Sequence, residues 1–498
     1  MLKRVLIGLG AIFMVVVLIA GIILFRTFTF GGNVEVQTVE LADVPDFNGE
    51  EIAKRLSTAI QIRTQTVSAG DPRPGQEGPW LEFREFMTSS YPELFNTAET
   101  NLIDDHTVLV RWAGRDETLD PILMMAHQDV VPVNMGTMDD WDASPFSGAI
   151  QDGYVYGRGT MDDKGSLVTI LEAANALVAS GYQPTRTIWM LFGHDEEVSG
   201  SGAQSAVDYF ERENIRMEMV LDEGFFVIDP FPLTGSAVAL IGIAEKGYVT
   251  IRVTARAAGG HSSIPPRNSA GVQLAKAILA LDENQVEADF TKPPISQMLS
   301  AVAEDMPFTQ RMAFANLWLF RGMVEGEFAK SGEANAIIRT TTAPTMMAGA
   351  VKENVLPQQA TALINFRLHP NDSIDSVLQH VRDVTSEIDG VTSDIAEASG
   401  IGSEASPVSP TSNRAYAVLA SVARETSGGA PVAPALVLGA TDSRWTTEIS
   451  DSIYRFVPTV IPSSDVGGMH GTNERISIEN LERMARGYAQ IMVGMSSE

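Results

Sequence analysis

The residues Gly193-His194-Asp195-Glu196-Glu197 directly follow an apolar run, Ile188-Trp189-Met190-Leu191-Phe192, and this stretch decides the fold. The run predicts a strand buried on both faces, which is typical of a parallel sheet covered by helices. Two adjacent carboxylates at the end of such a strand carry a desolvation cost unless a cation or a buried donor satisfies them. We therefore interpret this strand end as part of a functional site.

Two further strand ends carry the same pattern. Ile122-Leu123-Met124-Met125-Ala126 precedes His127-Gln128-Asp129, and Met219-Val220-Leu221 precedes Asp222-Glu223. The carboxyl ends of parallel strands meet at one edge of a sheet, so these side chains should lie close together. Oxygen and imidazole ligands at such an edge favour a carboxylate-rich metal centre. The sequence thus predicts a metallohydrolase built on an α/β sheet.

The composition limits the ligands and the partners. The chain of 498 residues is long enough for two domains. It contains no cysteine, so any metal must be bound by histidine and carboxylate side chains. The formal net charge of −28 argues against nucleic acid or an anionic membrane surface as a partner, since both attract basic faces.

The N-terminus predicts a membrane anchor. Val5 to Phe25 is a run of 21 uncharged residues, long enough as a helix to cross about 30 Å of hydrocarbon. Lys3 and Arg4 precede it, so the positive-inside bias places the rest of the chain outside the cytoplasm. A cleaved signal peptide is the alternative, although the bulky Leu24-Phe25-Arg26 is unlike a small-residue cleavage site. We expect the anchor in residues 1–30 and a tether in residues 31–44.

The strand pattern changes near Glu245. Segments 247–253 and 361–367 alternate apolar and polar residues, which indicates strands with one solvated face. Helical spacing at 270–281 and 374–388 falls between or after them. This combination is typical of an α+β domain.

The chain therefore divides into two predicted domains. Residues 45–244 and 406–498 would form the catalytic domain, and residues 245–405 an inserted α+β lid or dimerisation domain. The predicted fold class is α/β, with a mixed, mostly parallel sheet flanked by helices.

A glycine-rich loop supplies further candidate ligands. Gly157-Arg158-Gly159-Thr160-Met161-Asp162-Asp163-Lys164-Gly165 opens a predicted helix that is apolar nearly all round. An N-cap would explain one of its acidic residues. The second acid, the lysine and the flanking glycines favour a ligand-binding loop.

These motifs together resemble the co-catalytic zinc peptidases, a family that includes aminoacylase, carboxypeptidase S and glutamate carboxypeptidase. His127-Gln128-Asp129, the loop through Asp162, Glu196-Glu197, Asp222-Glu223 and Met469-His470-Gly471 occur in the family's order and spacing. The resemblance covers residues 45–498 and is strongest to the carboxypeptidase S and N-acyl-amino-acid hydrolase branch. The branch with a cysteine ligand is excluded, because the chain has no cysteine.

The resemblance implies two Zn2+ ions per chain, which Co2+ or Mn2+ can replace. Asp162 would bridge the ions with both carboxylate oxygens, and its peptide bond to Asp163 would be cis. His127 and one acid of the pair Asp222-Glu223 would complete one site, and Glu197 and His470 the other. Of the pair we favour Asp222 from its spacing to Glu197, although relatives differ on which acid binds.

The resemblance also implies the remaining roles. Glu196 would be the general base, taking a proton as a metal-bound hydroxide attacks the carbonyl and passing it to the leaving nitrogen. Asp129 would orient the His127 imidazole. In the inserted domain, His261 matches a histidine that assists the carbonyl oxygen, in many members from the partner subunit.

Asn354 and Arg367 match the family's substrate-binding pair, since a planar guanidinium suits a free carboxylate. Plain structural roles stay open for both, as a turn residue and as a surface ion-pair former.

The predicted function is hydrolysis of an amide bond next to a free carboxylate, as in a carboxypeptidase, dipeptidase or N-acyl-amino-acid hydrolase. The expected partners are a small peptide or N-acyl amino acid, the membrane, and a second copy of the chain through the inserted domain. A catalytically inactive, membrane-anchored binding protein on the same scaffold is the alternative, disfavoured because base and ligands are all present. A one-metal zinc aminopeptidase would not explain the insertion or His261.

Overall fold

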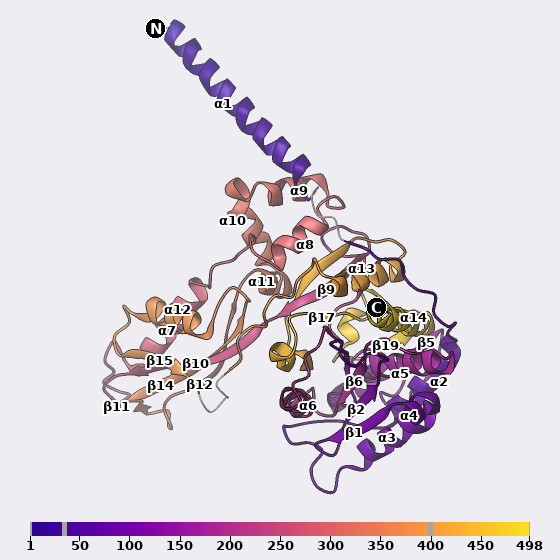
Figure 1. The fold of residues 1–498 in the computed structure, drawn as a ribbon. Coiled ribbons are helices and arrows are strands. Elements are labelled where there is room, and N and C mark those ends of the chain that lie inside the picture. Colours follow the sequence, from indigo (N-terminus) through magenta and orange to yellow (C-terminus); the bar gives the residue numbers. More distant parts are fainter. Residues whose placement is uncertain (1, 32–36, 397–401, 498) are drawn as a thin grey trace.

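The computed structural model describes residues 2–31, 37–396 and 402–497. A larger body surrounds the central sheet, a smaller domain lies beside it, and the helix α1 (Leu2–Thr29) projects away from both (Figure 1). Over Lys3–Thr29, α1 has the length and composition to cross a membrane, with mean hydropathy 3.0. The predicted tether falls partly outside the described residues, and its described part from 37 to 44 has no regular secondary structure.

Ten strands of the described chain form the central sheet. In spatial order they are β1 (Glu99–Ile103), β2 (Thr107–Trp112), β6 (Ile188–Gly193), β3 (Ile122–His127), β7 (Met219–Asp222), β17 (Ile453–Arg455), β9 (Val238–Glu245), β8 (Val227–Asp229) and β18 (Val460–Pro462), with β16 (Val432–Val437) beside β9. β3 runs parallel to both β6 and β7, so the carboxyl ends of all three meet at one edge.

Helices cover both faces of this sheet. Ile188, Met190 and Phe192 of β6 enter one core, whereas Trp189 and Leu191 enter the core on the opposite face. A strand packed on both sides needs apolar residues throughout, which explains the unbroken run that opens the predicted site. The first core is built with α2 (Gly49–Gln61), α3 (Gly78–Ser90), α4 (Pro92–Thr97), α5 (Lys164–Ala179), α13 (Arg414–Thr426) and α14 (Ile478–Ser496), and the second with α6 (Ser201–Arg212).

The inserted segment contains a second, antiparallel sheet with its own core. Its strands are β12 (Thr341–Ala348), β14 (Gln359–Leu368), β10 (Gly247–Arg256) and β15 (Val391–Ile395), in that spatial order. α7 (Ala270–Glu283) and α12 (Ile374–Thr385) supply the rest of that core. The alternating pattern of β10 and β14 therefore corresponds to one face packed on helices. A short pair, β11 (Gly260–His261) and β13 (Val355–Leu356), extends from this domain.

The insertion also contains four helices beyond those predicted, and they pack elsewhere. They are α8 (Ile295–Ala301), α9 (Phe308–Ala315), α10 (Leu317–Phe328) and α11 (Gly332–Ile338). Their core includes Val238 and Leu240 of β9 with Ala433 and Ala435 of β16. These helices thus belong by packing to the central sheet rather than to the antiparallel one.

The remaining short elements border the sheet edge that carries the predicted ligands. They are the small sheet of β4 (Ile150–Gln151), β5 (Tyr154–Tyr156) and β19 (Arg475–Ser477), and the 3-10 turns η1 (Met135–Asp140), η3 (Asp442–Glu448) and η4 (Val466–Gly468).

Candidate metal centre

The strand ends bring most of the predicted site residues together. They are His127 at the end of β3, Glu196 and Glu197 after β6, Glu223 after β7, Asp162 between β5 and α5, and His470 after η4. Within the described chain, His127 groups with Glu196 and Glu223, and also with Asp162 and Glu197, with ligand atoms within 4.8 Å of one another. Parallel pairing of β3 with its two neighbours is what creates this convergence.

Asp162 lies between two imidazoles. Its Oδ1 is 3.0 Å from Nε2 of His127, and its Oδ2 is 3.0 Å from Nε2 of His470. Glu197 completes the second side, with Oε2 3.1 Å from Nε2 of His470. The peptide bond between Asp162 and Asp163 is cis. One carboxylate thus presents an oxygen to each of two histidine-carboxylate groups.

The acids Asp222 and Glu223 have different contacts in the structure. Oε1 of Glu223 is 3.4 Å from Nε2 of His127. The oxygens of Asp222 instead accept hydrogen bonds from the backbone N–H groups of Glu223, at 2.9 Å, and Ser443, at 2.7 Å. The Asp222 carboxylate is therefore hydrogen-bonded to the backbone after β7, and Glu223 is the acid that faces His127.

The crowded acids and imidazoles at this site are compatible with a bound cation. Burial and the neighbouring Asp162 raise the pKa of Glu223 to about 8. Burial also raises the pKa of Asp163, whose buried carboxylate oxygens have no hydrogen-bond partner among the described residues. Hydrogen bonds with Asp162 and Glu197 raise the pKa of His470 to about 10. Crowded buried carboxylates beside imidazole nitrogens fit divalent cations such as Zn2+, which take nitrogen and oxygen ligands.

Glu196 is positioned beside this group by Asp129. The Asp129 carboxylate accepts the backbone N–H groups of Glu196 at 3.1 Å and Glu197 at 3.2 Å. Nδ1 of His127 is 3.0 Å from the Asp129 carbonyl and 3.4 Å from its carboxylate. Burial raises the pKa of Glu196 well above its usual range. Asp129 therefore connects the imidazole with both acids that follow β6.

Two residues at this site have no signal in the local sequence. Glu474 is fully buried, and its Oε1 accepts the backbone N–H groups of Gly159, Met161 and Asp162 at 3.0, 2.8 and 3.2 Å. Nη1 of Arg444 is 3.7 Å from Oε1 of Glu196. Glu474 shapes the loop of Asp162 from more than 300 positions away, and only the folded chain brings the two together.

The three predicted residues of the inserted domain lie apart from this cluster. Nδ1 of His261 is 2.7 Å from the Ser263 hydroxyl, and the neighbouring Ser262 N–H donates to the Asn354 carbonyl. The Arg367 guanidinium lies 5.9 Å from the Tyr248 ring centre. β11, which carries His261, is at the far end of the inserted domain (Figure 1). Among the described contacts, none joins these residues to the cluster around Asp162.

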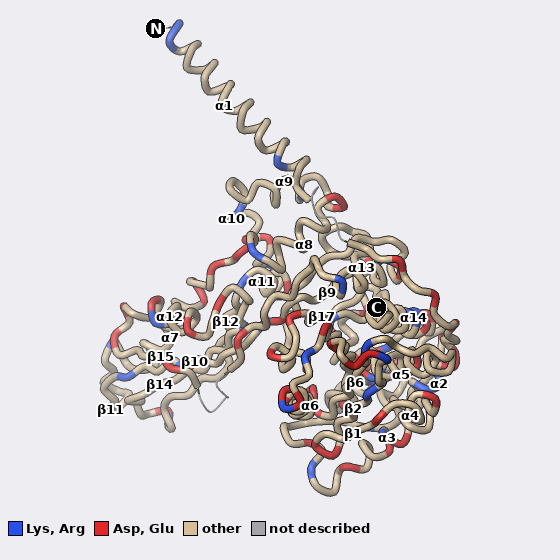
Figure 2. The backbone as a smooth tube through the Cα atoms, viewed as in Figure 1, with Lys and Arg blue, Asp and Glu red and all other residues tan. Residues whose placement is uncertain are grey.

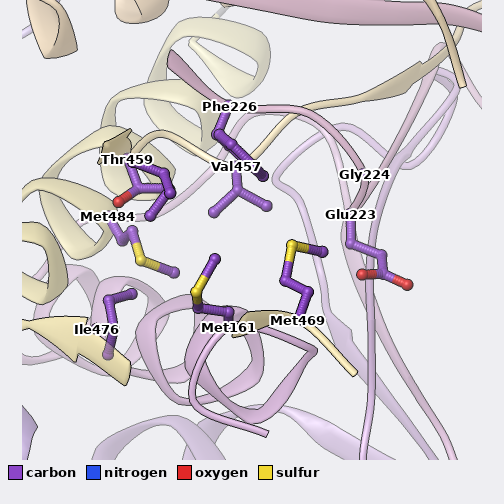
Figure 3. A pocket seen from close by; sticks show the side chains of 10 residues that line it. Met161, Glu223, Gly224, Phe226, Val457, Thr459, Met469, Ile476 and Met484 are labelled. Carbon is purple, nitrogen blue, oxygen red and sulfur yellow. The ribbon is translucent and has the colours of Figure 1, made fainter. Parts of the chain in front are cut away.

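A small apolar pocket adjoins the cluster at Glu223. Met161, Met469 and Met484 converge on it, with Phe226 beside them (Figure 3). Its volume of about 20 Å³ has room for a water molecule. Met161 and Met469 directly precede the ligand candidates Asp162 and His470. Methionine side chains are flexible and fill irregular gaps of this kind.

Known proteins are similar to this chain in sequence and in fold. A model of Peptidase family M20/M25/M40 matches residues 123–493. The probable carboxypeptidase S-like 2 of Dictyostelium discoideum is 35% identical over 448 residues, which are 89% of this chain and 84% of that protein. The N-fatty-acyl-amino acid synthase/hydrolase PM20D1 of Xenopus tropicalis is 34% identical over 492 residues, 97% of this chain and 94% of that protein.

Solved structures are similar in fold. The M20 family metallo-carboxypeptidase Sso-CP2 from Sulfolobus solfataricus has a TM-score of 0.60 and 17% identity, over 89% of this chain and 98% of that one. Human carnosine dipeptidase 1 has a TM-score of 0.57 and 17% identity, over 90% and 97%. These likenesses confirm the predicted fold class, and the relatives confirm the predicted branch. The chain therefore belongs to peptidase family M20/M25/M40, and it is a hydrolase of amide bonds.

Proposed function

We propose that this protein is a two-metal hydrolase that cleaves the amide of an N-acyl amino acid beside its free carboxylate. One observation carries the proposal: Asp162 presents one oxygen to His127 and the other to His470, each at 3.0 Å. A bridging carboxylate between two histidine-carboxylate groups is what a pair of divalent ions needs. Glu196 lies within reach of one of these groups.

The donor set assigns the residues that would hold the ions. His127, Asp162 and Glu223 would bind one Zn2+, and Asp162, Glu197 and His470 the other. Bound there, the ions would polarise the substrate carbonyl and lower the pKa of the attacking water. The His470 side chain is 53% exposed, so substrate can approach from its side of the cluster.

Glu196 moves the proton. Its buried carboxylate would take the proton from the attacking water and deliver it to the leaving nitrogen, because it groups with His127 and Glu223 but is not needed as a ligand. Burial, which raises its pKa, makes it a better base than an exposed carboxylate. Arg444, 3.7 Å away, limits how far that pKa can rise.

The inserted domain would complete the site by moving or by pairing with a second copy. Arg367 would bind the substrate carboxylate through its planar guanidinium, with Asn354 beside it. His261 would donate a hydrogen bond to the carbonyl oxygen as negative charge develops there. Because His261 and Arg367 are exposed on a separate core, either domain closure or a partner subunit must bring them to the cluster.

The substrate class rests on the pocket and on the relatives. The apolar, methionine-lined pocket beside Glu223 supports an apolar acyl group or side chain next to the scissile bond. A similar protein is named an N-fatty-acyl-amino acid synthase/hydrolase. Small peptides are the second candidate, favoured by similarity to a probable carboxypeptidase S-like protein. A catalytically inactive binding protein has no observation in its favour, because Glu196 and all the ligand candidates are present.

Hydrolysis assays on the full chain would separate these candidates. The panel would hold N-acyl amino acids with short, medium and long acyl chains and matched dipeptides, with zinc content measured in parallel. We expect two zinc ions per chain, faster cleavage of long acyl chains than of dipeptides, and loss of activity on chelation. Faster cleavage of dipeptides would show that small peptides, rather than N-acyl amino acids, are the preferred substrates. Full activity in metal-free protein would refute the two-metal site.

A further inference from the structure

The last turns of α1 are packed into the rest of the protein. Thr27 and Asn316 are both fully buried. Nδ2 of Asn316 donates to the Thr27 hydroxyl and to the Ile23 carbonyl, each at 3.3 Å. Nε of Arg26 donates to the Ala315 carbonyl at 2.9 Å. α1 is therefore attached to the end of α9 by side-chain contacts, in addition to the chain that follows it.

These contacts fix the depth of α9 and α10 relative to a membrane. The 21 uncharged residues from Val5 to Phe25 span roughly 32 Å as a helix, close to the hydrocarbon thickness of about 30 Å. Arg26 then lies at the outer headgroup level. Since Arg26 contacts Ala315, the last residue of α9, the start of α10 lies at that level too.

α10 presents an apolar face that is about half exposed. Trp318, Leu319 and Met323 are 55%, 49% and 61% exposed, and Phe308 of α9 is 48% exposed. Their spacing on α10 forms one stripe, whereas Val324 on its other side is buried in the core. α9 and α10 lie across the foot of α1 (Figure 1), and the charged residues along them are Arg311, Arg321, Glu325 and Glu327 (Figure 2).

We propose that this surface, the α9–α10 platform of Phe308, Trp318, Leu319 and Met323, inserts into the lipid interface around the anchor. Its partner is a zwitterionic lipid surface, because the stripe is apolar and the net charge of −28 disfavours anionic lipid. Tryptophan is enriched at the level where α10 begins. The enzyme is then held at the membrane by two contacts, α1 and the platform, in a fixed orientation rather than on a loose tether.

The absence of cysteine allows a direct test with the full chain. Met323→Cys and, as matched control, Val351→Cys are each labelled with an environment-sensitive fluorophore and reconstituted into phosphatidylcholine nanodiscs. Val351 is 97% exposed and lies in the inserted domain, between β12 and β13. Bromines on the lipid acyl chains should quench the label at 323 about twofold or more, because interfacial helices sit about 5–10 Å into the headgroup and acyl boundary. The label at 351 should keep its emission.

Three outcomes would overturn the proposal. Equal emission at both positions would place the platform in water. Protection of position 323 only when two copies share a nanodisc would make it a contact between chains. If α1 is cleaved from the mature chain, its length no longer sets the depth of α10 in the membrane. Leu319→Cys provides a second label on the same stripe, so that misfolding of one variant leaves the test intact.

Discussion

The central sheet and the inserted domain place their functional residues in different ways. On the central sheet, His127, Glu197 and Glu223 follow neighbouring parallel strands, so the fold alone brings them together. In the inserted domain, His261 lies on β11 and Arg367 on β14. Both strands pair antiparallel with other strands of that domain, and neither residue contacts the cluster. The first region is therefore preorganised, whereas the role proposed for the second region would need a movement or an association.

The histidines of the two regions show the same contrast. Hydrogen bonds with Asp162 and Glu197 raise the pKa of His470 to about 10. In the inserted domain, burial and the nearby Lys246 lower the pKa of His369 to about 4. The sheet edge thus stabilises positive charge, which suits a cation, and the inserted core excludes it.

The sharpest test of preorganisation separates the two adjacent acids after β6. Glu196→Gln should lower kcat by about 10²–10⁴, the range for a lost general base, while zinc content stays near two ions per chain. Glu197→Gln should instead lower zinc occupancy, because its carboxylate faces His470 at 3.1 Å. Steady-state kinetics and metal analysis on both variants provide the measurement. Equal loss of zinc in both, or an active Glu196→Gln enzyme, would contradict the division of roles.

The matching test in the inserted domain concerns His261. His261→Ala should keep both metals and the fold while kcat falls by about 10²–10³, as for a lost oxyanion donor. His380→Ala removes another histidine of the same domain, one whose Nε2 contacts the Asn284 carbonyl, and it should leave kcat unchanged.

Mixing subunits decides whether His261 acts across a dimer. Heterodimers of His261→Ala and Glu196→Gln chains hold one site with both residues intact if each site borrows His261 from its partner. Partial recovery of activity would support that arrangement. Verified heterodimers without recovery would assign His261 to its own chain, and a near-wild-type rate for His261→Ala would remove it from the site.

Substitutions of the two acids at the end of β7, Asp222 and Glu223, should have a smaller effect, which is limited to metal binding. Glu223→Gln should cost one of the two metals, since Glu223 faces His127. Asp222→Asn should weaken metal affinity only about 10–100-fold, as expected for a group that supports a ligand. Titration of both variants with zinc is the measurement. Full loss of one metal in Asp222→Asn with normal binding in Glu223→Gln would restore Asp222 as the ligand.

These cases show what the sequence can and cannot determine. Strands β3, β6 and β7 were predictable because burial on both faces requires unbroken apolar runs, and their parallel pairing makes the acids converge. Which of Asp222 and Glu223 faces the site depends on a hydrogen bond from Ser443, far along the chain. Helices α8, α9 and α11 are only seven or eight residues long, and α10 is apolar on two faces, so none of them shows a clear helical periodicity.

The smallest expected effect concerns the stability of the inserted domain. The pKa of His369 is about 4 in the folded chain, against 6.5 for a free histidine. Between these values the unfolded chain binds more protons than the folded one, so the free energy of unfolding falls as pH falls. From pH 6.5 to 5.5 the loss should be roughly 1 kcal/mol, and it should level off as the pH falls below the folded pKa.

His369→Asn should remove this pH dependence. The measurement is the difference in unfolding free energy between wild type and variant, by denaturant titration of metal-free protein at several pH values, so that other titrating groups cancel. His380→Asn, which replaces another histidine of the same domain whose Nε2 lies 2.9 Å from the Asn284 carbonyl, is the matched control for loss of a histidine side chain. A difference between wild type and His369→Asn that does not change with pH would mean that His369 binds a proton equally well in the folded and unfolded chains. The inserted domain would then accept a protonated histidine, as the sheet edge does. The two regions would differ only in how their functional residues are arranged.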